Sequence, residues 1–115
     1  MAIRIKTKED IAILREGGKR HATILRKVAE HVRPGIKTIE LDKIAHDLIR
    51  AEGDIPSFLN FSPQGAKFPF PGSICISIND EIVHGIPGTT ILKEGDIVKL
   101  DLGLTHEKLI TDAAI

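Results

Sequence analysis

The sequence of 115 residues predicts an α+β fold, with two helices in its first half and antiparallel strand pairs in its second half. Two observations predict this order. Apolar residues recur at helical spacing as far as about residue 50. Beyond residue 72 they alternate with polar residues or form short runs bounded by Gly, Pro and Asn, which is typical of strands. A chain of this length fits one domain with a modest core.

The first helix is expected from residue 7 to about residue 32. Thr7 stands three residues before Asp10, a variant of the capping box that precedes an apolar stripe. Gly17 and Gly18 each weaken a helix by about 1 kcal/mol relative to Ala. Because glycine has no side chain, the pair also allows close packing of this helix against a sheet.

A second helix is expected after Thr38, which is placed to act as its N-cap. The apolar residues that follow have the i, i+3, i+4, i+7 spacing of one helix face: Leu41, Ile44, Ala45, Leu48 and Ile49. Gly53 is placed to end this helix.

Residues 54–72 are predicted to form a long irregular segment, because they contain four of the six prolines. All four aromatic residues of the chain also lie here: Phe58, Phe61, Phe68 and Phe70. Two interpretations are open: the rings anchor a loop on the core, or they form the wall of an apolar pocket. Residues 73–78 then alternate in the manner of a strand, and residues 82–84 are expected to return as its partner after a turn at Asn79-Asp80.

Asp101 and Asp112 each interrupt an apolar run that reads as a strand, within residues 96–104 and 109–115. Aspartate is depleted in strand interiors, and a carboxylate among Leu, Val and Ile loses hydration. If the two strands form a hairpin centred between His106 and Glu107, Asp101 lies opposite Asp112 on one face, with Cβ atoms about 5 Å apart. Two carboxylates that close repel each other unless one holds a proton or a divalent cation binds both. The hairpin therefore predicts half of a metal site.

A plainer interpretation of the two aspartates stays open. Either one can be a solvated residue of an edge strand or can pair with Lys99 or Lys108. His-Glu is also not a strong hairpin dipeptide such as Asn-Gly, so the register rests on inference from the pattern.

Composition excludes several classes of partner. Sixteen basic and sixteen acidic residues cancel, so nothing suggests a nucleic-acid or membrane partner. No segment approaches the roughly 20 apolar residues of a membrane span. The lone Cys75 forbids an internal disulfide, which makes the cytoplasm the expected location. The chain stops inside an apolar run at residues 113–115, so residues 1–115 are expected to be an incomplete domain.

His84 and Cys75 have local contexts that bear on their roles. His84 follows an apolar run and precedes Gly85-Ile86-Pro87, where an imidazole can face a cleft and hydrogen-bond a developing oxyanion. A core or surface histidine without a functional role is the competing interpretation. Nothing basic flanks Cys75, which favours packing over reactivity. His21, His31 and His46 are expected on solvated or boundary helix faces, and His106 is expected in a turn.

Two stretches, residues 73–87 and residues 92–101, strongly resemble type I methionine aminopeptidases, and Asp112 follows Asp101 at that family's eleven-residue interval. Residues 5–7 and 32–42 match as well, so the resemblance covers essentially the whole chain. It implies that the chain is the N-terminal half of a pita-bread fold. It also implies an enzyme that removes the initiator methionine from nascent polypeptides in the cytoplasm.

The resemblance further implies two divalent metal ions, with Co, Mn, Fe, Zn and Ni as candidates. Asp101 resembles the aspartate that chelates one metal ion, and Asp112 resembles the aspartate that bridges both. His84 matches the histidine that contacts substrate and steadies the tetrahedral intermediate. Phe70 and Cys75 match positions that line the methionine pocket, and Phe61 is a further candidate for that wall.

This sequence departs from the family pattern in two places. The metal-ligating His and two Glu of the family lie beyond residue 115, so the isolated chain is expected to be inactive. Residues 60–67 replace a shorter family segment and lack its histidine, which leaves the fit of substrate open. A monomer is expected, with the nascent N-terminus as partner and the ribosome as a further candidate. Two other functions remain: a non-catalytic relative that binds nascent peptide or the ribosome, and a proline-specific metallo-aminopeptidase.

Overall fold

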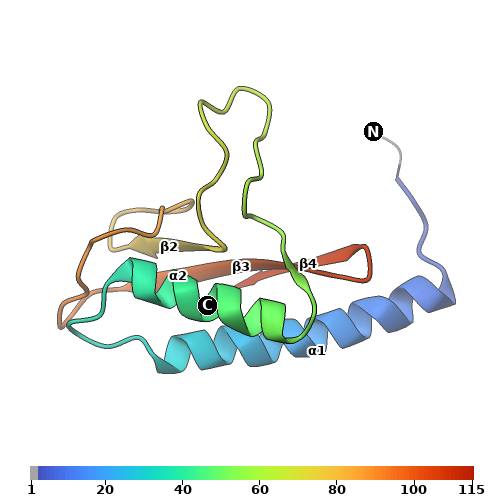
Figure 1. Ribbon diagram of the computed structural model, residues 1–115, viewed down its shortest axis with the longest axis horizontal. Coiled ribbons are helices and arrows are strands. Elements are labelled where there is room, and N and C mark those ends of the chain that lie inside the picture. Colours follow the sequence, from blue (N-terminus) through green and yellow to red (C-terminus); the bar gives the residue numbers. More distant parts are fainter. Residues whose placement is uncertain (1–2) are drawn as a thin grey trace.

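A computed structural model describes residues 3–115 and contains two helices and a four-stranded sheet (Figure 1). The helices are α1, Lys8–Glu30, and α2, Thr38–Ala51. The strands are β1, Ile55–Pro56; β2, Ile74–Ile78; β3, Val98–His106; and β4, Leu109–Ala114. The predicted order of two helices before the main strands is therefore confirmed.

The start of α1 follows the predicted capping box. The Thr7 hydroxyl accepts a hydrogen bond from the Asp10 amide, and the Asp10 carboxylate accepts one from the Thr7 amide, both at 3.0 Å. These bonds satisfy amides that a helix leaves without internal partners. Gly17 packs as expected for a close contact, because a Cβ at this position would lie 3.3 Å from the Cβ of His106.

The start of α2 differs from the prediction. Its N-cap is Lys37, whose amide donates to Glu40, and Thr38 is the first helical residue. The Thr38 hydroxyl instead bridges to the distant loop at Gly88, accepting from its amide at 2.8 Å and donating to its carbonyl at 3.2 Å. A tertiary contact therefore uses the oxygen that local sequence assigned to capping.

Strand β3 is the centre of the sheet. Along one edge it pairs antiparallel with β2 and then with the short β1, and along the other edge it pairs with β4. Residues 82–84 are not a strand, so the expected pairing of 73–78 with 82–84 is wrong. Strand β2 pairs with β3 instead, because the longer apolar strand offers five successive partners for it.

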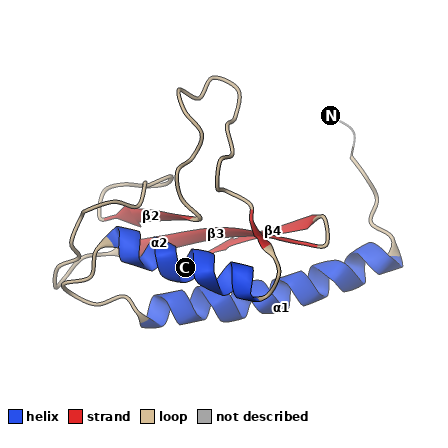
Figure 2. Ribbon diagram, viewed as in Figure 1, coloured by secondary structure: helices blue, strands red, loops and turns tan. Residues whose placement is uncertain are grey.

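The two helices pack on one face of the sheet, and the segment between β1 and β2 extends away from it (Figures 1 and 2). The core between helices and sheet is aliphatic and includes Val28, Leu41, Ala45, Ile49, Ile74, Leu102 and Leu104, all fully buried. Alternate residues of β3 and β4 point to the opposite face, which the helices leave open. No helix within residues 3–115 is both long and apolar enough to cross a membrane.

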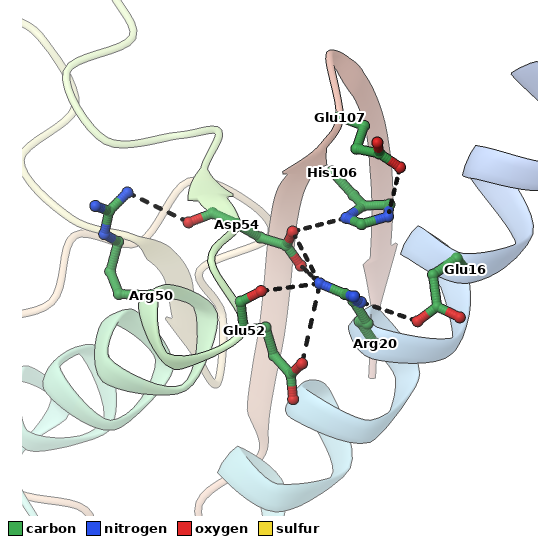
Figure 3. Close-up of polar contacts among 7 residues, drawn as sticks. All are labelled: Glu16, Arg20, Arg50, Glu52, Asp54, His106 and Glu107. Atoms are coloured by element: carbon green, nitrogen blue, oxygen red, sulfur yellow. Dashed lines mark hydrogen bonds and ion pairs between the residues drawn. The ribbon is translucent and has the colours of Figure 1, made fainter.

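A buried polar cluster ties the far end of the hairpin to the helices (Figure 3). The carboxylate of Asp54 lies 2.8 Å from His106 Nδ1 and 3.2 Å from an Arg20 guanidinium nitrogen. The Arg20 guanidinium also donates to the Glu52 carbonyl and to the Glu16 carboxylate, at 2.9 Å each. His106 was expected in a turn, and it is instead the buried last residue of β3. His21 was expected on a boundary face, and it is also buried, with Nδ1 2.7 Å from the Thr111 hydroxyl.

Candidate functional site

Asp101 and Asp112 lie on the same face of the sheet, although they are not directly opposed. Asp101 pairs with Ala114, and Asp112 pairs with Gly103, so the two carboxylates are diagonal neighbours. The predicted register is wrong by two residues because the hairpin is centred between Glu107 and Lys108. Both of these residues have positive φ, 45° and 76°, as a two-residue hairpin turn requires. A shift of two residues preserves the face, because side chains alternate with a period of two.

The carboxylate of Asp112 strongly influences that of Asp101. Burial, a hydrogen bond with Asp112 and the negative charge of Asp112 raise the pKa of Asp101 from 3.8 to about 6. Asp101 Oδ1 is buried and has no hydrogen-bond partner among residues 3–115. A buried oxygen of this kind is costly unless something else binds it. The pair therefore presents negative charge that the described part of the chain does not neutralise.

An apolar cavity of about 590 Å³ opens beside the two aspartates. It is lined by side chains from the irregular segment, from the loop after β2 and from the open face of the sheet: Ser57, Phe58, Phe61, Pro63, Ala66, Lys67, Phe68, Phe70, Cys75, His84, Ile86, Asp101, Ile110 and Asp112. All six residues that the sequence singled out for the site line this one cavity. Of the two interpretations of the phenylalanines, the pocket wall is the one observed.

Phe58 is held in the cavity wall by two contacts. Its ring meets Phe70 edge to face, with centroids 6.4 Å apart and planes at 85°. Its other contact is Gly103, where a Cβ would lie only 2.5 Å from the Phe58 ring. Glycine in the middle of β3 thus makes room for an aromatic ring on the open face.

Cys75 and His84 reach the cavity from β2 and from the loop that follows it. Cys75 pairs with Asp101 across the sheet, and burial together with the nearby carboxylates raises the pKa of its thiol to about 12. The thiol is therefore protonated at neutral pH and packs as a small apolar group, as predicted. His84 has a left-handed backbone, with φ of 61°, and its positive charge when protonated lowers the pKa of Asp101.

Sequence reasoning missed Ile110, a wall residue for which a signal existed. Ile110 precedes Asp112 by two residues in a strand, so it shares its face. Gly103 also lies two residues from Asp101. Only the structure shows that the Phe58 ring occupies the space that a side chain at Gly103 would need.

The donor atoms of the site fit a divalent cation. Paired carboxylates supply oxygen ligands, and a cation held by both residues would remove the repulsion and would satisfy the unpartnered Asp101 Oδ1. Among the described residues, however, no group of three His, Cys, Asp or Glu side chains is close enough to hold a metal ion. Residues 3–115 thus contain two candidate ligands and an adjoining pocket rather than a full coordination sphere.

Comparison with known proteins agrees with this geometry. Residues 12–115 match the model of metallopeptidase family M24. The chain is 45% identical to methionine aminopeptidase 1 of Bacillus subtilis over 98 residues, which are 85% of this chain and 37% of that protein. It is 38% identical to the methionine aminopeptidase of Aquifex aeolicus, covering all of this chain and 45% of that protein. The chain thus spans less than half the length of these curated relatives.

Solved structures support the same fold. The methionine aminopeptidase of Rickettsia prowazekii superimposes with a TM-score of 0.90 at 35% identity, covering 98% of this chain and 43% of that one. The Xaa-Pro dipeptidase of Bacillus anthracis superimposes with a TM-score of 0.74 at 21% identity, which shows the fold alone. The predicted half of a pita-bread fold is confirmed. The chain belongs to metallopeptidase family M24.

Proposed function

We propose that this chain provides one half of a methionine aminopeptidase, an enzyme that removes the N-terminal methionine from nascent polypeptides. The observation that carries the proposal is the placement of two unneutralised carboxylates, Asp101 and Asp112, at the wall of an apolar cavity. The similarity to methionine aminopeptidases over nearly the whole chain supports it. The substrate is the free N-terminus of a cytoplasmic nascent chain, and the monomeric state and contact with the ribosome remain predictions.

Asp101 and Asp112 would hold divalent metal, with two ions expected from the resemblance. When bound, such ions supply Lewis acidity toward a peptide carbonyl and lower the pKa of a water molecule. The contribution of this chain is to keep two oxygen donors on one face of a hydrogen-bonded hairpin. We propose that the remaining ligands lie outside these residues, which is why residues 1–115 alone are expected to be inactive.

His84 and the apolar wall act on the substrate in this proposal. His84 lines the cavity together with Asp101, so its imidazole can donate a hydrogen bond to the oxyanion that develops at the scissile carbonyl. Phe61, Phe70 and Cys75 offer an uncharged surface to the methionine side chain. Full burial of such a side chain is worth about 1.5–3 kcal/mol.

The test uses the intact protein encoded by the complete reading frame. Purified protein is stripped with a chelator, reloaded with Co²⁺ or Mn²⁺, and given peptides that begin Met-Ala-Ser or Ala-Pro. Metal-dependent release of methionine from the first peptide is expected, and Asp101→Asn should abolish it. Cleavage of the Ala-Pro peptide instead would show a proline-specific peptidase, and no cleavage of either by loaded protein would favour a non-catalytic relative.

A second measurement addresses residues 1–115 alone. We expect this chain, supplied with the same metal ions, to release no methionine from the Met-Ala-Ser peptide. Turnover by the isolated chain would contradict the proposal that further ligands are required.

A further inference from the structure

His84 has a backbone conformation that something in the structure must maintain. Its φ is 61°, in the left-handed region that residues with a side chain seldom adopt. Such conformations persist when the surrounding structure determines them, and they concentrate at functional sites. The contacts of the neighbouring residues show what holds His84 in this conformation.

The residue after His84 is bound to the outer edge of β2 by two hydrogen bonds. The Ile76 amide donates to the Gly85 carbonyl at 2.9 Å. The Gly85 amide donates to the hydroxyl oxygen of Ser77 at 3.0 Å. The chain approaches so closely that a Cβ on Gly85 would lie 1.9 Å from the Ile76 carbonyl oxygen, so only glycine fits. This contact replaces the regular strand pairing that the sequence predicted for residues 82–84.

Ser77 is the one side chain that takes part in these two bonds. It is 3% exposed, so its hydroxyl oxygen has little access to water. If the oxygen is removed, the Gly85 amide loses its acceptor inside the protein and must find water by moving away from β2. That movement turns the peptide that joins Gly85 to His84, and with it the direction of the imidazole.

We propose that Ser77 is a positioning residue, which acts through the Gly85 amide to hold His84 in its left-handed conformation at the cavity. The importance of this for catalysis rests on the proposed function of His84. The geometric part of the inference concerns the backbone of His84 and Gly85 and is measured independently of activity.

The experiment compares Ser77→Ala with Ser77→Thr in the intact protein. Thr keeps a hydroxyl oxygen at the same branch point and suits a strand. NMR reports the His84 Cα chemical shift and its amide-to-Hα coupling, both sensitive to φ, and hydrogen exchange reports the Gly85 amide. In Ser77→Ala we expect the Gly85 amide to exchange about tenfold faster. We also expect the Cα chemical shift and the coupling of His84 to move away from the values of a left-handed residue. Ser77→Thr should restore both.

Thr38→Val is the matched control. It removes another hydroxyl that accepts from a glycine amide of the same loop, at Gly88, 2.8 Å away. Loss of this bond is expected to leave the φ-sensitive parameters of His84 unchanged. If Ser77→Ala does not fold, Ser77→Cys replaces it. A thiol resembles the serine hydroxyl in shape but accepts hydrogen bonds only weakly, so the same changes at Gly85 and His84 are expected.

The outcomes separate the inference from the proposed function. With Met-Ala-Ser as substrate, Ser77→Ala should lower kcat about tenfold with little change in KM, and Ser77→Thr should recover it. Unchanged exchange of Gly85 and unchanged His84 parameters in Ser77→Ala would overturn the inference. Altered His84 parameters with unchanged kcat would support positioning by Ser77 and would count against a catalytic role for His84.

Discussion

Asp54 and Asp101 are two carboxylates of the same small sheet that meet opposite surroundings. Asp54 precedes β1 and is 3% exposed, and it contacts the Arg20 guanidinium and the His106 imidazole (Figure 3). Asp101 lies in β3, faces the carboxylate of Asp112, and leaves one buried oxygen without a partner among the described residues.

The difference separates an architectural carboxylate from the one that we propose to bind metal. A buried charge is stable when opposite charge and hydrogen-bond donors surround it, and Asp54 uses these donors to join α1, the end of α2 and the hairpin. A carboxylate beside another carboxylate has no such compensation inside the chain. Asp101 is therefore the one of the two that is available to a ligand from outside.

Asp101→Asn should have the largest effect on activity. In the intact protein we expect metal-dependent release of methionine to fall at least about 100-fold, because an amide replaces a charged metal ligand. The free energy of unfolding of the metal-free protein should rise, since repulsion from Asp112 is removed. An enzyme assay measures the first effect, and urea unfolding in the presence of a chelator measures the second. Lower stability of the variant would contradict the conclusion that Asp112 repels Asp101.

Asp54→Asn should show the reverse pattern, with a loss of stability of about 2 kcal/mol from weakened charge-assisted hydrogen bonds. Metal affinity should change little. Asp47→Asn is the matched control, because Asp47 forms an exposed ion pair with Lys43 and its loss should cost under about 0.5 kcal/mol. Urea unfolding and metal titration give the readouts, and equal effects of both variants would argue against a structural role for Asp54.

Gly103→Ala should destabilise by about 1–3 kcal/mol, because the new methyl group collides with Phe58 on the open face beside Asp101. Phe58→Leu in the same protein should recover part of this loss, since a smaller side chain leaves space for the methyl group. A double-mutant cycle measured by thermal unfolding reports the coupling. Additive effects would show that the ring does not rest on Gly103 in solution.

The last expected effect is a pH dependence of stability in the metal-free protein. The pKa of Asp101 is about 6 in the folded state and near 3.8 when unfolded. As pH rises from 3.8 to 6 the unfolded chain releases this proton first, so the contribution of Asp101 to stability falls and then levels above pH 6. The readout is the difference between wild type and Asp101→Asn in urea unfolding from pH 4 to 7. Divalent cation should stabilise the wild type more than Asp101→Asn, and so oppose the fall in wild-type stability at higher pH.

Much of the fold followed from local patterns. The capping box at Thr7 and the apolar stripe of α2 marked both helices, and alternation marked β2. The shared face of Asp101 and Asp112 followed from their odd separation in sequence, because residues that face each other across this hairpin are also an odd number of positions apart. What failed were contacts between distant segments: the bridge from Thr38 to Gly88, the burial of His106 against Asp54, and the attachment of Gly85 to β2.

By itself, the sequence determined the order of helices and strands and the face on which the two aspartates stand, because periodicity is a local property of the chain. Only the tertiary structure decided the hairpin register, the gathering of four phenylalanines, His84 and both aspartates around one cavity, and which carboxylate is neutralised. The physical reason is that the burial of a side chain, and the neutralisation of its charge by a partner, depend on neighbours far away in the chain. Arg20 and Asp54 are 34 residues apart, and their contact exists only after α1 has packed against the sheet.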